Sequence, residues 1–330
     1  MSSAIADARV LVTGATGFVG GHLARRLASL GAHLRVLARP TSNLSGLESI
    51  PYERCDGDLT DPVSLARAAD SVDFVFHSGG LVAAPSEETF IRVNGEGTKN
   101  MCAGAKSAAP ALRRFVYISS MAAAGPAPPG KLIDEEMPAR PITPYGASKR
   151  LGEKWVQQFE FPWTTIRPPA VYGPEDKAIL PLFRMAAWHF KAVVAKDGVA
   201  SVVFVDNLVD GIIQSALSPG AVGQTFYVAD ELPLPRLELM NLIQEAVGTW
   251  AVAVNVPDWV VKAAGRITES VAKGFGKVAL FDRDKARDLL APNWGCRIDH
   301  ARRFLSYEPR FTTSEGMRLT AAWYRRQGWI

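Results

Sequence analysis

The sequence has few cysteines and no pattern that would tie them to a metal or to a disulfide framework. Its 330 residues include only three, Cys55, Cys102 and Cys296, and these lie far apart in the chain. No Cys-x-x-Cys pair and no Cys/His spacing typical of zinc sites occurs, and an odd number of cysteines cannot all pair with one another. We therefore expect reduced thiols, no bound metal and a reducing, cytoplasmic compartment.

The sequence also lacks the apolar and basic runs that are typical of membrane and nucleic-acid-binding proteins. No uncharged stretch approaches the ~20 residues that a bilayer-spanning helix needs. The N-terminus has no basic segment followed by an apolar one, so we expect no signal peptide. The net charge is +4, with lysines and arginines spread along the chain, and we expect no nucleic-acid partner.

The first half of the chain alternates short apolar runs with helical patterns, as in a parallel α/β sheet. Strands are predicted at 9–13, 33–38, 74–77 and 115–119, and helices at 18–30 and 143–159. We predict an α/β fold, a Rossmann-type doubly wound parallel sheet with a smaller, mostly helical C-terminal substrate domain. The predicted domains are 1–171 plus 201–223 for the sheet, and 172–200 plus 224–330 for the smaller domain.

Three glycines follow the first predicted strand. Gly14, Gly17 and Gly20 form a GxxGxxG pattern between that strand and a helix. Gly14 would let the chain turn, Gly17 would let the backbone approach a pyrophosphate, and Gly20 would permit close helix–strand packing. The helix N-terminus would then face the anion. A glycine triplet also occurs in ordinary turns, so its place at the first strand-to-helix junction carries the prediction of a dinucleotide site.

The end of the second predicted strand bears on the choice of cofactor. Dinucleotide-binding folds place there the acid that binds the ribose 2′-hydroxyl of NAD, but this sequence has Arg39 and no acid. A guanidinium can pair with a 2′-phosphate. We therefore predict NADP as the preferred cofactor and NAD as the alternative, in which case Arg39 stacks on adenine or points to solvent.

A Tyr-x-x-x-Lys pair lies in the helix predicted from residue 143. Tyr145 and Lys149 are four residues apart and share a helix face. A phenol with a pKa of ~10 is a poor acid or base at neutral pH, but a nearby ammonium lowers that pKa. Tyr145 is therefore predicted to be the general acid and base. Ser120 ends the preceding strand, where its hydroxyl would bind the substrate oxygen or simply cap a loop.

Seven segments together resemble the extended short-chain dehydrogenase/reductases, within the NAD-dependent epimerase/dehydratase superfamily. The resemblance covers residues 8–217 well and the C-terminal part loosely. The segments are TGATGFVG (13–20), GDLTD (57–61), HSGG (77–80), VNGEGTKN (93–100), VYISS (116–120), YGASK (145–149) and RPPAVYGP (167–174). HSGG departs from the more usual HxAA, a small change that should leave cofactor binding intact.

The resemblance assigns roles to individual residues. Ser120, Tyr145 and Lys149 match the family's catalytic serine, tyrosine and lysine, and Asn94 matches its structural and active-site asparagine. Asp58 and Leu59 would lie by the adenine, Ser78 and Gly79 against the pyrophosphate, and 168–171 beside the nicotinamide. The full predicted cofactor set is Gly14, Thr16, Gly17, Phe18, Val19, Arg39, Asp58, Leu59, Ser78, Gly79, Asn94, Ser119, Tyr145, Lys149, Pro168, Ala170 and Val171.

Other polar residues are expected to be structural. His77 lies at a strand end and is predicted to support the fold rather than to catalyse. The remaining histidines show no ligand spacing. Asp206 stands near a helix start, and we predict that it is the N-cap of that helix.

Three features separate the chain from the nucleotide-sugar branch of the superfamily. Ala170 stands where an asparagine usually precedes VYGP, residues 198–204 contain no arginine to pair with a diphosphate, and Ser119-Ser120-Met121 replaces the Thr-Asp-Glu-like set of dehydratases. The chain resembles the 3β-hydroxysteroid dehydrogenase and dihydroflavonol reductase branches more closely.

We therefore predict hydride transfer between nicotinamide and a ketone or secondary alcohol of a fairly apolar small molecule. The alternatives are a nucleotide-sugar 4-epimerase or dehydratase, and a non-catalytic dinucleotide sensor. The residues that make the substrate side apolar are Trp188, Phe190, Val193, Val194, Trp259 and Val260.

Two expectations concern larger partners. A homodimer formed through the helix that bears Tyr145 is expected by analogy with the superfamily alone. Residues 257–277 are basic and partly amphipathic, which is typical either of a membrane-surface helix or of a helix whose apolar side faces the core. We favour the core-facing interpretation, so membrane contact is not expected.

Overall fold

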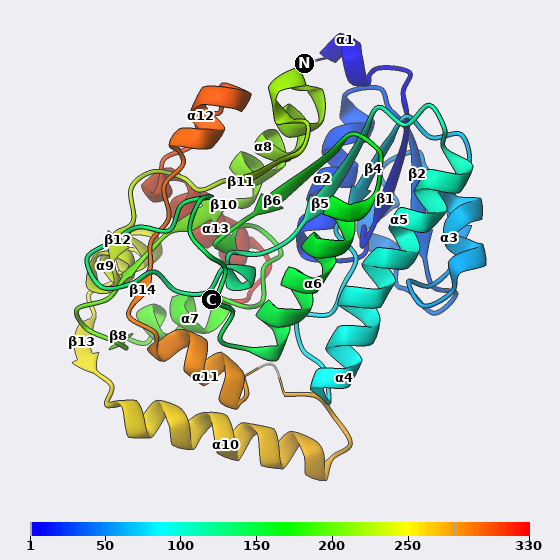
Figure 1. The fold of residues 1–330 in the computed structure, drawn as a ribbon. Helices are drawn as coiled ribbons and strands as arrows, with labels where there is room; N and C mark the ends of the chain where they lie inside the picture. The colour runs from blue at the N-terminus through cyan, green and yellow to red at the C-terminus, as the bar shows by residue number, and fades with distance from the viewer. Residues whose placement is uncertain (1, 280) are drawn as a thin grey trace.

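The computed structural model describes residues 2–279 and 281–330. At its centre lies a parallel sheet with the strand order β11-β6-β5-β4-β1-β2-β3 (Figure 1). The strands are β1 (Arg9–Thr13), β2 (His33–Ala38), β3 (Glu53–Asp56), β4 (Phe74–His77), β5 (Arg114–Ile118), β6 (Trp163–Arg167) and β11 (Gln224–Tyr227). The order reverses between β1 and β4, the switch point at which such sheets bind ligands. The predicted Rossmann-type fold is confirmed.

Helices cover both faces of this sheet. The helices are α2 (Phe18–Ser29) and α8 (Val205–Leu217) on one face, and α3 (Pro62–Ala68), α5 (Gly97–Ala108) and α6 (Pro144–Gln158) on the other. Side chains of β1 alternate between the two cores: Val10 and Val12 pack beneath α2 and α8, and Leu11 beneath α3 and α5. This alternation is the period of two that a strand imposes.

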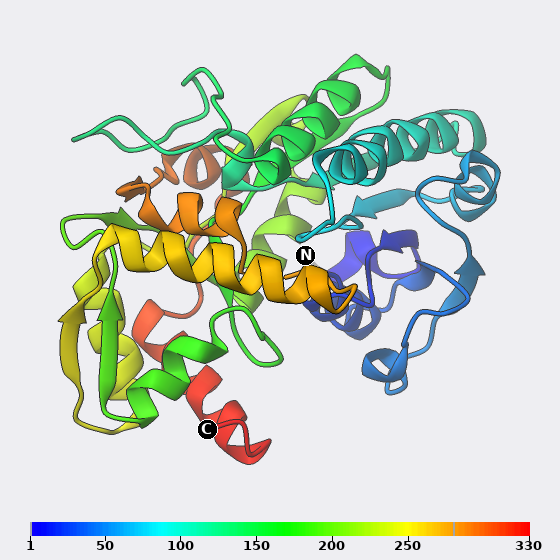
Figure 2. The same cartoon turned by 90° about the horizontal axis from the view of Figure 1, so that it is seen from below.

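A smaller, mostly helical region follows, with its own hydrophobic core (Figure 2). Its helices are α7 (Leu180–Ala187), α9 (Arg236–Val247), α10 (Asp258–Gly274), α11 (Arg283–Leu290) and α13 (Thr313–Arg326). Helix α12 (Asp299–Leu305) instead packs on α8 and β11 of the central-sheet domain. The short strands of the smaller region, with one from the preceding loop, are β7 (Ala170–Tyr172), β8 (Phe190–Val193), β9 (Val199–Ala200), β10 (Val202–Phe204), β12 (Leu234–Pro235), β13 (Val252–Asn255) and β14 (Asn293–Trp294). Two one-turn α-helices, α1 (Ser2–Ile5) and α4 (Glu87–Phe90), lie outside this region.

The domain boundary predicted at residue 223 needs correction. Strand β11 was predicted to belong to the substrate domain, but it pairs with β6 at the edge of the central sheet. Phe226 and Tyr227 are buried in the core beneath α2 and α8. The polar Gln224 and Thr225 hide the strand in the sequence, because an edge strand half exposed to solvent lacks a continuous apolar run.

Two smaller predictions are also wrong. Asp206 is not an N-cap, because α8 begins at Val205 and Phe204 occupies the cap position without a side-chain hydrogen bond. The apolar side of 257–277 does not face the core either, since only Val261 and Gly265 of α10 are buried. No helix among the described residues is long and apolar enough to cross a bilayer.

Candidate active site

The glycine loop joins β1 to α2 at the switch point of the sheet. Gly14 has φ +75°, and a Cβ there would lie 2.7 Å from the backbone nitrogen of Gly79. A Cβ on Gly20 would lie 2.2 Å from the carbonyl oxygen of Gly14. Glycine is therefore required where β1 approaches the end of β4 and where α2 packs on the loop. Thr16 and Gly17 are exposed, which leaves the N-terminus of α2 open to an anion.

A chain of buried hydrogen bonds holds this edge of the sheet together. Thr13 Oγ1 accepts from the Gly79 N–H at 3.0 Å and donates to His77 Nδ1 at 2.7 Å. His77 Nε2 then donates to Thr98 Oγ1 at 3.0 Å, a tautomer that we infer from its partners. Burial, assisted by the positive charge of Lys149, lowers the pKa of His77 to about 3. His77 is thus neutral and structural, as predicted.

Asn94 lies in a π-helical turn, Ile91–Glu96, between α4 and α5. Its amide accepts from the Leu81 N–H at 2.7 Å and donates to the Leu81 carbonyl and to Ser148 Oγ, each at 3.0 Å. The side chain therefore ties the segment after β4 to α6, the helix that carries Tyr145. Both polar atoms of the Asn94 side chain thus have protein partners, and its contact with the cofactor stays a prediction.

Tyr145 stands in the first turn of α6. The Thr143 side chain caps that helix by accepting from the Gly146 N–H at 3.3 Å, and Pro144 occupies the first position, as predicted. Burial raises the pKa of Tyr145, and the neighbouring Ser120 side chain partly opposes the rise. Ser120 Oγ also accepts from the Ala122 N–H at 3.1 Å. The sequence motifs for the acid and the substrate-binding hydroxyl therefore meet at the end of β5.

Lys149 is buried beneath this pair. Its Nζ donates to the Ile118 carbonyl at 2.6 Å and lies 4.5 Å from the centre of the Tyr117 ring. Burial lowers the pKa of Lys149 to about 7, although the carboxylate of Glu153 opposes the shift. The ammonium is therefore fixed by α6 and β5 before any ligand arrives.

Glu153, which lies on α6 with Tyr145 and Lys149, forms a buried ion pair with Arg167. Glu153 accepts hydrogen bonds from Arg167 at both oxygens, each at 2.8 Å, and from Ser119 Oγ at 2.7 Å. Burial alone would raise the pKa of Glu153, but the bonds and charge of Arg167 hold it below its ordinary value. The hydroxyl of Ser119 therefore supports Glu153, and its contact with the cofactor stays a prediction.

The residues predicted to lie near the adenosine of the cofactor follow strands β2 and β3. Arg39 is exposed directly after β2. Burial would raise the pKa of Asp58, but hydrogen bonds from Thr60 and the nearby guanidinium of Arg39 hold it below its ordinary value. Leu59 lies close to Gly79, because a Cβ on that glycine would be 3.3 Å from Leu59 Cδ1. Arg39, Asp58 and Leu59 thus flank one corner beside the glycine loop.

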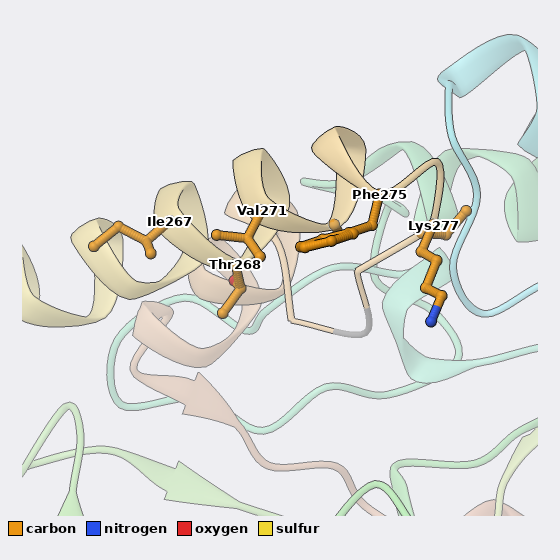
Figure 3. Close-up of a pocket in the computed structure, with 7 residues that line it drawn as sticks. Ile267, Thr268, Val271, Phe275 and Lys277 are labelled. Carbon is orange, nitrogen blue, oxygen red and sulfur yellow. The ribbon is translucent and has the colours of Figure 1, made fainter.

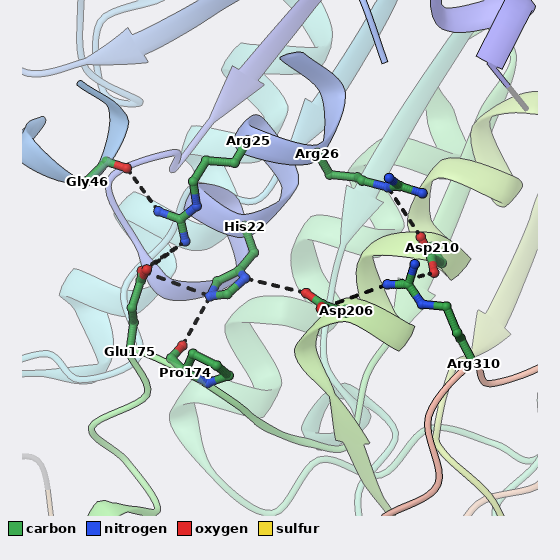
Figure 4. A network of polar contacts seen from close by, with 9 residues as sticks. All are labelled: His22, Arg25, Arg26, Gly46, Pro174, Glu175, Asp206, Asp210 and Arg310. Atoms are coloured by element: carbon green, nitrogen blue, oxygen red, sulfur yellow. Dashed lines mark hydrogen bonds and ion pairs between the residues drawn. The ribbon is translucent and has the colours of Figure 1, made fainter. Parts of the chain in front are cut away.

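The segment predicted to lie beside the nicotinamide is next to Ser120. The carbonyl of Pro168 accepts from the Met121 N–H at 2.9 Å, and Ala170 and Val171 begin β7. The turn that follows is anchored to the phosphate-loop helix α2 (Figure 4). Arg25 pairs with Glu175 at 2.9 Å, and His22 bonds the Pro174 carbonyl at 3.1 Å. These contacts therefore connect α2, which begins at the predicted pyrophosphate site, to the segment that follows the one predicted to lie beside the nicotinamide.

Helix α11 adds charged residues that sequence motifs did not reveal. Lys285 Nζ lies 5.1 Å from the centre of the Tyr145 ring, and Arg287 donates to the Ile142 carbonyl at 2.9 Å. Burial raises the pKa of the Asp288 carboxyl, on the same helix, to about 6. These residues follow Tyr145 by about 140 positions in a segment without motifs, so no signal in the sequence could have placed them there.

Two tryptophans predicted to lie on the apolar substrate side are exposed. Trp188 and Trp259 are 76% and 71% exposed, so they do not form a closed pocket.

Ser78, Phe18 and Val19 are partly buried around the glycine loop. Their contacts with the cofactor stay predictions.

Comparisons with known proteins identify the family of this chain. Residues 10–229 match the model of the NAD dependent epimerase/dehydratase family. A ceramide reductase of Caulobacter vibrioides is 30% identical over 98% of this chain and 97% of its own length. A 3-beta-hydroxysteroid dehydrogenase of Mycolicibacterium neoaurum is 30% identical over 96% of this chain and 91% of its own. The crystal structure of gox2253 superposes with a TM-score of 0.81 at 28% identity, covering 98% of this chain and 100% of that one.

Proposed function

The chain belongs to the NAD-dependent epimerase/dehydratase family, and we propose that it reduces a ketone of an apolar molecule with NADPH, or oxidises the corresponding alcohol. Its relatives include reductases and hydroxysteroid dehydrogenases, and it is an NAD(P)-dependent oxidoreductase. The finer proposal is carried by one observation: Ser120, Tyr145 and Lys149 meet at the carboxyl end of β5.

Each of the three residues has a separate task in this proposal. When bound, the nicotinamide cofactor supplies or accepts the hydride. Ser120 holds the substrate oxygen, and Tyr145 donates its phenolic proton to that oxygen in reduction or accepts it in oxidation. Burial raises the pKa of Tyr145 rather than lowering it as the sequence predicted, so the phenol is protonated at neutral pH and its donation depends on stabilisation of the phenolate. Lys149 stabilises the phenolate that proton transfer leaves behind.

The substrate class is proposed from the relatives and from what the site lacks. Two relatives are named for ceramide and for a hydroxysteroid, and both of these molecules are largely apolar. The strands β9 and β10 with their flanks, residues 198–204, provide no arginine for a diphosphate. Loss of NADPH absorbance with long-chain ketones or 3-oxosteroids would support the reductase. Turnover of a UDP-sugar without any ketone reduction would assign the chain to the epimerase alternative instead.

The preference for NADP can be tested at Arg39. Arg39→Ala is expected to weaken NADPH binding by about tenfold to a hundredfold, because a charge-assisted pair contributes about 1.5–3 kcal/mol. NADH binding should stay nearly unchanged, since NADH lacks the 2′-phosphate. Nicotinamide fluorescence titration measures both. Arg303→Ala removes an exposed arginine on α12 and serves as the control. Equal losses for NADH and NADPH would mean that Arg39 contacts the adenine rather than the phosphate.

A further inference from the structure

Helix α10 is long but packs against the protein along a narrow face. Of its 17 residues only Val261 and Gly265 are buried. Gly265 meets α11 closely, because a Cβ there would lie 2.7 Å from the Asp282 carbonyl oxygen and 3.1 Å from Ala286 Cβ. Figure 1 shows α10 at the lower edge of the molecule with α11 next to it, and Figure 2 shows it lying across the face seen from below. The rest of its surface is therefore available to a partner.

The exposed part of α10 is strongly apolar. Ile267, Val271 and Phe275 are 62%, 55% and 76% exposed, and their spacing of four residues places them on one face. With Val278 in the following turn they line a shallow groove (Figure 3). Trp259, near the start of the helix, is 71% exposed. Contiguous exposed apolar surface of this kind is uncommon in monomers and marks an interaction site.

Basic side chains lie on the side of the helix opposite this apolar face. Lys262, Arg266 and Lys273 are exposed and lie on one flank of the helix, at spacings of four and seven residues. Lys262 and Arg266 form no ion pair with any described residue. The acid Glu269 is already paired with Lys273 at 2.6 Å and with Arg283 at 3.2 Å. The free charge along the flank is therefore positive.

We propose that α10 and the turn after it dock on an anionic phospholipid surface. An interfacial helix combines an apolar face, often with Trp or Phe, and cations that meet lipid phosphates. Ile267, Val271 and Phe275 would enter the headgroup boundary, and Lys262 and Arg266, on the polar side of the helix, would attract anionic headgroups. A second copy of the chain is the other occupant, and the oligomeric state tests it.

The docked face lies close to the reacting groups. Helix α11, which packs on the inner side of α10, carries Lys285 within 5.1 Å of the Tyr145 ring centre. An apolar substrate dissolved in the bilayer would thus reach a site one helix layer away. This advantage rests on the proposed function, whereas the docking itself rests on α10 alone.

Vesicle co-sedimentation tests the docking with the full chain. We expect binding to phosphatidylcholine vesicles containing phosphatidylglycerol at low salt, and binding about tenfold weaker for the Ile267→Ser/Val271→Ser/Phe275→Ser variant. The control variant Val63→Ser/Val222→Ser/Leu319→Ser, which changes apolar residues that are 77%, 48% and 44% exposed elsewhere, should bind like the wild type. Lys262→Gln/Arg266→Gln should reduce the preference for anionic vesicles.

NADPH titration of the same proteins separates docking from catalysis. Unchanged NADPH binding in every variant, with vesicle binding lost only in the α10 variants, supports the proposal. The proposal is overturned if the wild-type protein does not bind anionic vesicles, or if the α10 triple variant binds them as strongly as the wild type. Either result leaves the proposed function intact. A wild-type dimer that the triple variant converts to a monomer also overturns it, because the face would then belong to a second copy. Failure of the wild type to bind NADPH would instead reject the proposed function.

Discussion

Replacing Tyr145 with Phe is expected to lower kcat by about 10³-fold, a typical contribution of a positioned proton donor, with little change in NADPH affinity. The phenylalanine retains the ring, which packs 5.9 Å from the Phe90 ring and beneath Lys285. Only the hydroxyl that would exchange a proton with the substrate oxygen is lost. The loss should therefore appear in kcat rather than in cofactor binding.

Single-turnover reduction of an apolar ketone, together with NADPH titration, measures both quantities. Tyr52→Phe is the matched control, because that partly buried tyrosine has no part in the proposed chemistry and its variant should turn over normally. A Tyr145→Phe protein that retains more than about a tenth of the wild-type kcat would show that another group transfers the proton. A wild-type protein that binds NADPH but reduces no ketone would point to the sensor alternative.

The sequence predicted best those features whose determinants are close together along the chain. Strands β2 and β4 have the predicted bounds, because each is a short apolar run. Tyr145 and Lys149 share a helix face by spacing alone, and the glycine loop is one continuous segment. Strand β11 was missed because its first two residues are polar and only its pairing with β6 makes it part of the sheet.

The supports of the site depend on contacts that spacing does not reveal. Glu153 and Arg167 lie on an adjacent helix and strand and meet only in the folded sheet, although a carboxylate four residues after Lys149 was a signal that the sequence did contain. The position of Lys285 over Tyr145 depends on how α11 packs. The exposure of α10 was likewise invisible, since an amphipathic pattern shows that a helix has an apolar face and not what covers it.

Glu153→Gln is expected to lower the free energy of unfolding by about 3–5 kcal/mol, because removing one partner of a buried ion pair leaves the other charge uncompensated. The side chains of Glu153 and Arg167 are 0% and 5% exposed. Urea unfolding at pH 7 measures the loss. Glu53→Gln is the matched control, because Glu53 is 62% exposed and pairs with Arg35 at 2.9 Å on the surface. Such an exposed pair contributes at most about 1 kcal/mol.

The loss should also depend on pH in one direction. The folded-state pKa of Glu153 lies below its ordinary value of 4.5, so its charge stabilises the fold above that value, and this contribution disappears as the pH falls through the lowered folded-state pKa. The stability difference between wild type and Glu153→Gln is therefore expected to be full at neutral pH and to shrink in acid. A difference that stayed constant as the pH fell would mean that lost packing, and not the charge facing Arg167, destabilises the variant. The charge would then have no part in holding Ser119 and Lys149 at the end of β5.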